Sequence, residues 1–243
     1  MGPGLGGDQA QGEGEGAFHG YLLLVSDRYR LSYAAAALCQ YSFYPILFIN
    51  VIDRGSRVLF DLLERLSSLT RVWFRQHPLL ADLQPIQLSA LLYLARCNRY
   101  SNTPLAVTEY LGLTKGTVSQ SLKALETKGL LVKTQDARDK RSVHLALTPA
   151  ARELLAAVMP PDFLAAAAQR MGTQAQALEG LLSDLLRNIQ RHENVPGFGL
   201  CKTCRFHRTT AKGGFCELTQ EPLTAPEREL ICREHQLAEP VEE

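Results

Sequence analysis

The sequence lacks an excess of charge of either sign, and it lacks the residue sets that mark common active sites. It holds 26 Lys and Arg against 25 Asp and Glu, which gives a formal net charge of +1. A chain so balanced is not attracted to nucleic acid as a whole, so any contact with DNA must come from a local basic patch. The sequence shows no phosphate-binding loop, no Ser/His/Asp set and no paired catalytic carboxylates, which argues against an enzyme.

Cysteine is scarce, with six residues in a chain of 243. Four of the six lie in the last 43 residues, and this is too few and too clustered for the disulfide scaffold of a secreted protein. We expect the reducing cytoplasm instead, where clustered cysteines bind metals. A hydrophobic content of 46% and a charged content of 21% are ordinary for a globular protein. The length allows one domain with an appendage, or two small domains.

The first 52 residues differ in composition from the rest. Residues 1–16 are rich in glycine and are expected to be disordered. Residues 31–52 contain no charged side chain, and this run is long enough for a membrane span. Polar residues and Pro45 interrupt it, however, and arginines flank it on both sides, so the charges do not orient it. We favour a dispensable extension, translated from upstream of the true start and not part of the native domain. A membrane anchor is the alternative.

Residues 53–193 have the apolar periodicity of helices and, in one region, of strands. Thr103, Thr114 and Thr148 are expected to cap helices, and Thr173 with Gln176 is expected to form a capping box. The predicted helices cover residues 53–75, 85–97, 104–111, 115–128, 149–159 and 173–191. The predicted strands cover 130–134 and 142–147, with a charged hairpin over 135–141 between them.

Two short helices joined at Gly112, followed by a two-stranded hairpin, predict a winged helix-turn-helix. In this motif the second helix enters the major groove of DNA through its N-terminal residues. At that place the chain has short or polar side chains suited to base edges and phosphates: Thr114, Lys115, Gly116, Thr117, Ser119 and Gln120. Val118, Leu122 and Leu125 fall on the opposite face, as a helix packed on a core requires.

A local excess of positive charge accompanies this motif. Between residues 115 and 141 there are seven basic side chains against three acidic ones. The basic residues are Lys115, Lys123, Lys128, Lys133, Arg138, Lys140 and Arg141. Such an excess on the helix and at the hairpin tip predicts a phosphate-binding surface that the net charge of the whole chain conceals.

A family resemblance rests on four runs: 105–111 (LAVTEYL), 114–119 (TKGTVS), 125–130 (LETKGL) and the hairpin tip 136–141 (DARDKR). They resemble the MarR family of bacterial regulators, whose wing carries the signature D-x-R-D-x-R. The similarity extends over about residues 53–193. One departure follows the wing, where the family commonly has L-T-x-x-G and this chain has LTPAA at 147–151. That changes the start of a helix and leaves the expectation of DNA binding intact.

The resemblance implies a mainly α fold, an α+β winged helix-turn-helix, in a homodimer whose first and last helices interlock. It places residues 115–123 in the major groove of a double-stranded, palindromic operator and Arg138 in the minor groove, while Asp136 and Arg141 brace the wing. Together with the basic tip, it makes these the expected DNA-binding residues: Thr114, Lys115, Thr117, Ser119, Gln120, Lys123, Arg138, Lys140 and Arg141.

Residues 194–243 form a separate cysteine-rich segment with the spacing C-x2-C-x11-C-x15-C, at Cys201, Cys204, Cys216 and Cys232. Four thiolates brought together in this way hold either zinc or an iron–sulfur cluster. Structural zinc usually takes two paired knuckles. This chain has one pair and two single cysteines, each expected on its own loop, which suits a larger object than one ion. A 4Fe-4S cluster is therefore the favoured metal centre, and zinc is the alternative.

The neighbours of these cysteines agree with a cluster. The apolar residues Phe206, Phe215, Leu218 and Leu223 are expected to shield it from water, and Gly213 and Gly214 to let backbone amides approach its sulfides. Over about 35 residues the segment is similar to high-potential iron–sulfur proteins and to the small cluster-binding subunits of some glycyl-radical enzymes, which hold a four-iron cubane through four cysteines.

The other histidines and cysteines have simpler expected roles. His207 and His235 are alternative metal ligands, although a histidine beside such a centre is more often a surface or supporting residue. Cys39 and Cys97 are expected to be buried small hydrophobes.

These features predict a transcriptional regulator in the cytoplasm, a repressor whose DNA affinity depends on a redox- or oxygen-sensitive cluster. The cysteine segment begins within ten residues of the end of the predicted dimer helix 173–191. A change in the cluster would move that helix and alter the spacing of two recognition helices. The alternatives are a zinc-stabilised repressor that responds to a small aromatic ligand, an electron-transfer protein, and a membrane-anchored regulator.

Overall fold

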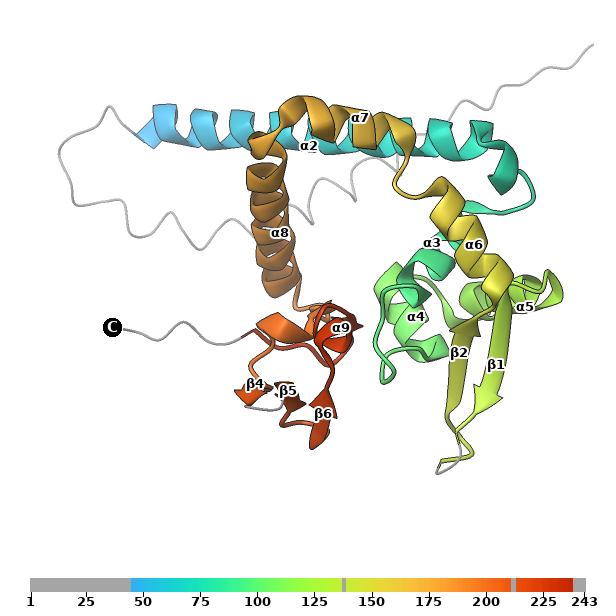
Figure 1. Ribbon diagram of the computed structural model, residues 1–243. Helices are drawn as coiled ribbons and strands as arrows, with labels where there is room; N and C mark the ends of the chain where they lie inside the picture. The colour runs from blue at the N-terminus through green and yellow to red at the C-terminus, as the bar shows by residue number, and fades with distance from the viewer. Residues whose placement is uncertain (1–44, 137–138, 211–212, 238–243) are drawn as a thin grey trace, which may run out of the picture. The chain divides into compact units, whose positions relative to one another are not determined.

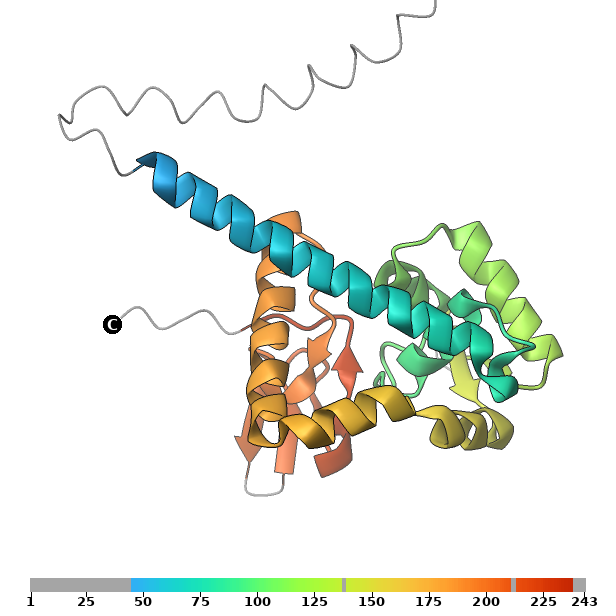
Figure 2. The ribbon, with the colours of Figure 1, turned by 90° about the horizontal axis from the view of Figure 1, so that it is seen from above.

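The computed structural model of the protein describes residues 45–136, 139–210 and 213–237. Its contacts divide the chain into two compact units, Met1–Arg65 and Leu66–Glu243. Helix α2 (Pro45–Gln76) runs across this division (Figures 1 and 2). It begins earlier than predicted, inside the apolar run 31–52, the rest of which lies outside the described residues, as do the glycine-rich start and Cys39. Within the described ranges, the helices are too short or too polar to cross a membrane.

The winged helix lies in the second unit and is built from six elements, close to their predicted bounds. These are α3 (Pro85–Leu94), α4 (Pro104–Leu111), α5 (Lys115–Thr127), β1 (Leu131–Gln135), β2 (Val143–Leu147) and α6 (Pro149–Val158). The predicted caps are confirmed: the hydroxyls of Thr103, Thr114 and Thr148 each accept a hydrogen bond from a backbone N–H in the first turn of the helix that follows. Gly112 takes a left-handed conformation with φ 63°, which glycine adopts readily, and so ends α4 just before α5.

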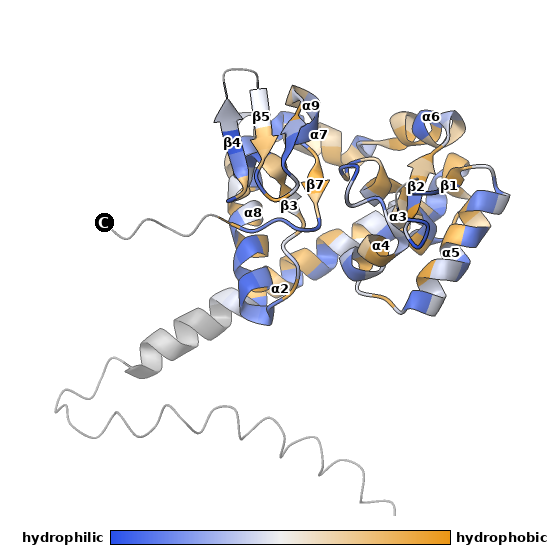
Figure 3. Cartoon of the chain, turned by 90° about the horizontal axis from the view of Figure 1, so that it is seen from below, coloured by the Kyte–Doolittle hydropathy of each residue, from blue (hydrophilic) through white to orange (hydrophobic). Residues whose placement is uncertain are grey.

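The core of the winged helix follows from the spacing of its apolar residues. Val118, Leu122 and Leu125 share one face of α5 and are almost completely buried, as predicted. Figure 3 shows hydrophilic and hydrophobic residues alternating around this helix. The three buried residues of α5 belong to a hydrophobic cluster that also includes Leu91, Tyr93, Ala106, Val107, Leu131 and Leu145. This packing fixes α5 in the fold and leaves its other face to solvent.

Strands β1 and β2 form an antiparallel hairpin, with Leu131 opposite Leu147 and Gln135 opposite Val143. Leu145 and Leu147 point to the core because side chains alternate along a strand. The tip of the hairpin includes residues 137 and 138, so Arg138 lies outside the described residues.

Two helices follow the winged helix: α7 (Asp162–Met171) and α8 (Thr173–Glu193). Helix α7 was not predicted, because prolines at 160 and 161 end the preceding pattern. The prediction of a capping box at Thr173 is also wrong. Gly172 occupies the cap position with φ 57°, no side chain caps the helix there, and Thr173 is already helical.

The cysteine-rich segment folds into a small module of short elements. In chain order these are β3 (Gly199–Leu200), the 3-10 turn η2 (Cys201–Thr203), β4 (His207–Thr210), β5 (Gly213–Cys216), β6 (Glu221–Leu223), α9 (Ala225–Arg228) and β7 (Ile231–Cys232). Strands β4, β5 and β6 form one antiparallel sheet, and β3 pairs with β7. Cys216 and Cys232 therefore lie at the ends of paired strands, and the expectation that each sits on its own loop is wrong.

Candidate functional site

The N-terminal half of α5 presents the predicted DNA-reading side chains to solvent. Thr114, Lys115, Thr117, Ser119, Gln120 and Lys123 are all exposed. The hydroxyls of Thr114 and Thr117 lie 2.9 Å apart and hydrogen-bond to one another. The same Thr114 oxygen accepts from the Thr117 backbone N–H at 3.3 Å. These two residues therefore hold the start of the helix in shape, and the side chains that follow stay open for contacts with a ligand.

The base of the wing tip is held by two aspartates. Asp136 accepts from the backbone N–H of Asp139 at 2.8 Å, and Asp139 accepts from the backbone N–H of Arg141 at 3.0 Å. His144 lies between the carboxylate of Asp136, at 3.0 Å, and the side chain of Asn102, at 2.6 Å. The expected bracing role of Asp136 thus has a structural basis, while the side chains of Lys140 and Arg141 are exposed.

Two of the seven basic residues are bonded to other groups of the chain at its surface. The Lys128 ammonium group donates to the backbone oxygen of Asp82, and Lys133 pairs with Glu126 at 2.8 Å. Among the described residues, the basic surface predicted from the sequence therefore reduces to Lys115 and Lys123 on α5 and Lys140 and Arg141 at the wing. These four are the candidates for a phosphate-binding face.

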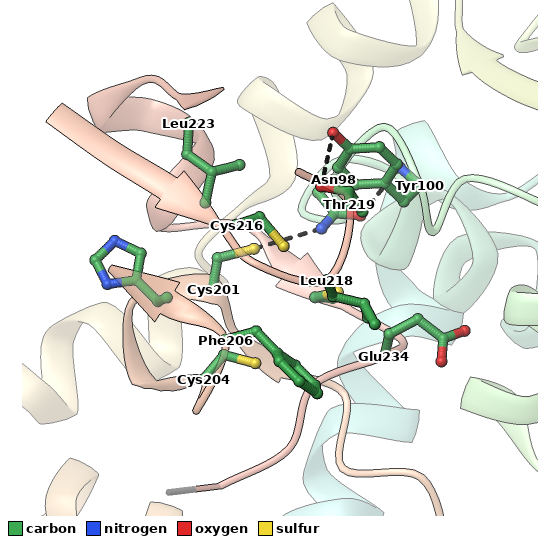
Figure 4. Close-up of a pocket in the computed structure, with 12 residues that line it drawn as sticks. Asn98, Tyr100, Cys201, Cys204, Phe206, Cys216, Leu218, Thr219, Leu223 and Glu234 are labelled. Carbon is green, nitrogen blue, oxygen red and sulfur yellow. Dashed lines mark hydrogen bonds between the residues drawn. The ribbon is translucent and has the colours of Figure 1, made fainter. Parts of the chain in front are cut away.

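The four cysteines of the C-terminal module line one pocket (Figure 4). Cys201 is buried, whereas Cys204, Cys216 and Cys232 are half-buried. Apolar walls come from Phe206, Leu218 and Leu223, and Asn98 and Tyr100 complete the lining from the winged helix. The sulfurs surround a shared space, and in the described ranges no three metal-binding side chains meet closely enough to hold a single ion.

Hydrogen bonds within this pocket shift the pKa values of Cys201 and Cys232 in opposite directions. The Cys201 thiol donates to Cys232, and this bond, with further donors from Asn98, Ser101 and the backbone of Glu234, lowers the pKa of Cys232 to about 6. The same bond raises the pKa of Cys201, where burial acts in the same direction. Their shared hydrogen bond therefore lowers the pKa of Cys232 and raises that of Cys201, and cysteine binds metals as the thiolate.

The two histidines of the module differ in position, because His207 lines the cysteine pocket and His235 does not. His235 is buried, shares a hydrogen bond of 2.9 Å with the Thr203 hydroxyl, and packs so tightly on Gly199 that a Cβ there would lie 2.6 Å from its ring. It serves to close the module. His207 lines the pocket, but within the described structure its buried Nε2 has no hydrogen-bond partner. Burial and the nearby Arg228 lower the pKa of His207, so it is neutral.

Two expectations about the surroundings of the cysteines are wrong. Phe215 does not line the pocket, because it neighbours Cys216 on β5 and successive side chains of a strand point to opposite faces. Gly213 and Gly214 do not line it either; they pair with β4. Gly214 is needed for another reason, since a Cβ there would lie 2.8 Å from the Arg228 side chain.

The cysteine module binds directly to the loop that joins α3 to α4. The backbone N–H of Ile231 donates to Arg96 at 2.8 Å, and the N–H of Asn98 donates back to Ile231 at 2.9 Å. Arg99 pairs with Glu221 at 2.7 Å and also with Glu227. The chain that leads into the module is fixed as well, because the ring of Phe198 meets those of Tyr93 and Tyr110 edge-on, with centroids 5.9 and 5.2 Å away.

A second link reaches the helix-turn-helix itself. Arg233, which follows Cys232, forms a two-pronged ion pair with Glu109 of α4, at 2.5 Å from Nε and 2.9 Å from a terminal nitrogen. Its backbone N–H donates to the buried Ser101 hydroxyl at 2.8 Å. Paired guanidinium–carboxylate contacts of this kind fix orientation as well as distance. The module is therefore attached to both ends of the segment 98–109.

The middle of the chain has a counterpart among known families. Residues 81–142 match the MarR family model. This stretch runs from just before α3 to the end of the wing tip and includes the whole helix-turn-helix. The winged helix of this chain therefore has a MarR-like fold.

Solved structures that match the chain include two of S. aureus MepR and one of the transcriptional regulator BldR. The chain is 23% identical to the S. aureus MepR–DNA complex, over 51% of this chain and 93% of that one, with a TM-score of 0.43. It is 22% identical to S. aureus MepR in its DNA-binding conformation, over 54% of this chain and 98% of that one, with a TM-score of 0.48. It is 20% identical to BldR from Sulfolobus solfataricus, over 58% of this chain and 97% of that one, with a TM-score of 0.44. No curated protein matches the chain.

The contacts between the MarR-type winged helix and the cysteine module were not predicted. Asn98 and Arg233 belong to no motif, and Glu109 belongs to one that gives no hint of this contact. Each is remote in sequence from its partner, as Asn98 is by 103 positions from Cys201. The one available signal was the position of Arg233 directly after a cysteine ligand candidate. Which residue it pairs with depends on how the chain folds back, and that is not a local property.

Replacing Glu109 with Gln is expected to lower the free energy of unfolding by about 1 kcal/mol at pH 7, since both partners are partly exposed. The ion pair with Arg233 lowers the pKa of Glu109. Its stabilisation is therefore complete above the ordinary carboxyl pKa and is lost as pH falls through the lowered one. Urea unfolding of both proteins at pH 7 and in acid measures this. A difference that persists in acid would contradict the assignment.

Proposed function

We propose that the protein is a homodimeric, DNA-binding transcriptional regulator, a repressor that reads a palindromic operator and whose affinity depends on an iron–sulfur cluster held by Cys201, Cys204, Cys216 and Cys232. The observation that carries the DNA-binding part is the exposed N-terminal face of α5 in a MarR-type winged helix. Short hydroxyl and amide side chains there fit base edges, and Lys115 and Lys123 fit phosphates.

Exposed apolar side chains support the homodimer. On α2, Val58 is 54% exposed and Leu62 58%, and on α8, Leu181 is 68% exposed and Leu186 56%. An amphipathic helix with an apolar stripe open to water calls for a partner that covers it. A second copy of the chain provides matching stripes on the same two helices. Dimers of this kind bring two recognition helices to half-sites about one turn of DNA apart.

The cysteine pocket supports a cluster by its donor set and its walls. Four sulfurs face one space, with Phe206, Leu218 and Leu223 excluding water from it. When bound there, a 4Fe-4S cluster would supply one-electron chemistry and sensitivity to oxygen. The backbone N–H of Gln236 donates to Cys204 at 3.5 Å and Asn98 donates to Cys201 at 3.4 Å, so the chain stabilises negative charge on both sulfurs.

Anaerobically purified protein tests the proposal, because one preparation can be compared as isolated and after a chelator has removed its metal. Duplexes selected from a random pool are expected to share a palindrome, and the two forms to differ about 5–150-fold in affinity for it. Broad absorbance near ~400 nm is the expected sign of iron–sulfur. Equal affinity of both forms would refute control by the metal, and failure to enrich any sequence would refute operator recognition.

Zinc is the second candidate for the pocket, because four thiolates also suit it once the sulfurs lie closer together than in this structure. A colourless protein that holds zinc and has the same DNA affinity in air and under nitrogen would favour this alternative. In that case the cysteines would be needed for folding of the module, and a small aromatic ligand would be the candidate effector.

A further inference from the structure

One residue of the winged helix reaches into the cysteine pocket. Asn98, between α3 and α4, is only 2% exposed. Its Nδ2 donates to the sulfur of Cys201 at 3.4 Å, as Figure 4 shows, and its Oδ1 accepts from the backbone N–H of Tyr100 at 3.2 Å. Because a backbone N–H can only donate, the amide oxygen must face Tyr100, and the NH2 group must face the sulfur.

We propose that Asn98 is a thiolate-binding residue of the cysteine site, supplied by the winged helix, and that it couples the state of the cysteines to the helix-turn-helix. The coupling rests on the function proposed above, in which metal loading controls DNA affinity. A neutral thiol is a weak acceptor, whereas a thiolate or metal-bound sulfur is a strong one. A buried amide donor aimed at sulfur is therefore well satisfied only when the sulfur carries negative charge.

Asn98 is positioned to respond to both inner cysteines. Its backbone pairs with Ile231, directly before Cys232, and that strand pairs in turn with β3, which leads into Cys201. Any rearrangement of these two sulfurs therefore acts on the side chain and on the backbone of the same residue.

The loop transmits this to the DNA-reading helices over a few residues. The Tyr93 hydroxyl of α3 donates to the backbone oxygen of Ser101 at 2.8 Å, and Ser101 also accepts from Arg233. Two positions on, Thr103 caps α4, which packs on α5. This route from the sulfurs to the recognition helix needs no movement of α8.

The variant Asn98→Asp tests the contact with sulfur. It is nearly isosteric and keeps the acceptor for Tyr100, but it places a carboxylate against the thiolates. In full-length, anaerobically purified protein, EDTA is expected to remove the metal at least roughly tenfold faster than from the wild type, since hydrogen bonds to charged groups are worth that much or more. Release at the wild-type rate, with circular dichroism and melting temperature unchanged, would overturn the proposal.

Asn102→Asp is the matched control, because it makes the same chemical change in the same loop. Its side chain contacts Leu145, at 3.2 Å, and His144, and no cysteine. Wild-type release is expected from this variant. Equally fast release from both variants would show that general loosening of the loop explains the effect, and would overturn the role of Asn98.

The variant Asn98→Ala tests the coupling, since it removes the donor without adding charge. Loaded and stripped forms of this variant are expected to bind the selected duplex within about twofold of each other, whereas the wild type differs by 5–150-fold. A full wild-type difference in the variant would overturn the coupling and leave the proposed function standing. No difference in the wild type itself would refute metal control, and with it the coupling, while the release experiment still decides the contact with sulfur.

Discussion

Serine in place of Cys216 is expected to abolish metal binding by the C-terminal module. Cys216 ends strand β5 and its sulfur lines the pocket with the other three, so the variant leaves three thiolates and a poor ligand. Loss of a residue that only supports a metal ligand commonly lowers metal affinity about 10–100-fold. Loss of a ligand itself is therefore expected to lower the metal affinity by more than about 100-fold. Iron, zinc and sulfide analysis of anaerobically purified protein, with its absorbance near ~400 nm, measures the result.

Cys97→Ala is the control for this experiment. Cys97 is buried in the core of the winged helix, its sulfur lies 3.7 Å from the backbone oxygen of Leu94, and burial raises its pKa to about 12. It does not line the cysteine pocket. Metal content is therefore expected to match the wild type. A Cys216→Ser protein that keeps its metal, or a Cys97→Ala protein that loses it, would refute the ligand assignment.

Alanine in place of both Lys115 and Lys123 is expected to weaken DNA binding strongly and to flatten its dependence on salt. Each lysine neutralises a phosphate in the proposed complex and occurs twice in a dimer. The slope of log affinity against log salt changes by about 0.9 for each lost contact, so the double variant should lower it by roughly 3–4. At moderate salt this corresponds to a loss on the order of a hundredfold or more. Fluorescence anisotropy at several salt concentrations measures both quantities.

Lys128 and Lys133 provide the matched control, because they carry the same charges in the same region. Lys128 is bonded to Asp82 and Lys133 to Glu126, so neither ammonium group is as available to phosphate. Replacing both with alanine is expected to change the salt slope by less than about 1. If this control lowers the slope as much as the Lys115/Lys123 variant does, the DNA interface has been assigned to the wrong face.

The sequence suggests one connection between the cysteine module and the helix-turn-helix, and the structure shows a second. The sequence places the cysteine segment directly after α8, and a relay through that helix remains a prediction. The contacts of Asn98 and Arg233 join the same segment to the loop 95–103 and to α4. The two routes differ in what they require, because the first depends on a dimer and the second operates within one protomer.

Local signals explain the parts of the fold that were predicted. Threonines at 103, 114 and 148 satisfy helix N–H groups within three residues, and the apolar spacing of α5 needs only the helix period. By contrast, the start of α8 was mispredicted, because a capping sequence was assumed to be used as a cap. Helix α7 went unnoticed because it directly follows two prolines that end the preceding pattern, and because four of its ten residues are alanines, which mark an apolar face weakly.

The cysteine site also has features that local sequence predicts and features that it does not. Spacing alone identified the four cysteines that line one pocket, and it failed for Phe215, Gly213 and Gly214, whose directions depend on strand pairing. Asn98 could not be found at all, because its role exists only once residues 103 positions apart are brought together.

By itself, then, the sequence determined the winged helix, its exposed reading face and the grouping of the cysteines, since caps, periodicity and spacing act over a few residues. Only the tertiary structure decided that two lysines pair with neighbouring groups of the chain, that His235 lies outside the cysteine pocket, and that the cysteine module rests on the loop before α4. Those outcomes depend on which distant groups meet, and burial then selects the partners that satisfy each polar atom.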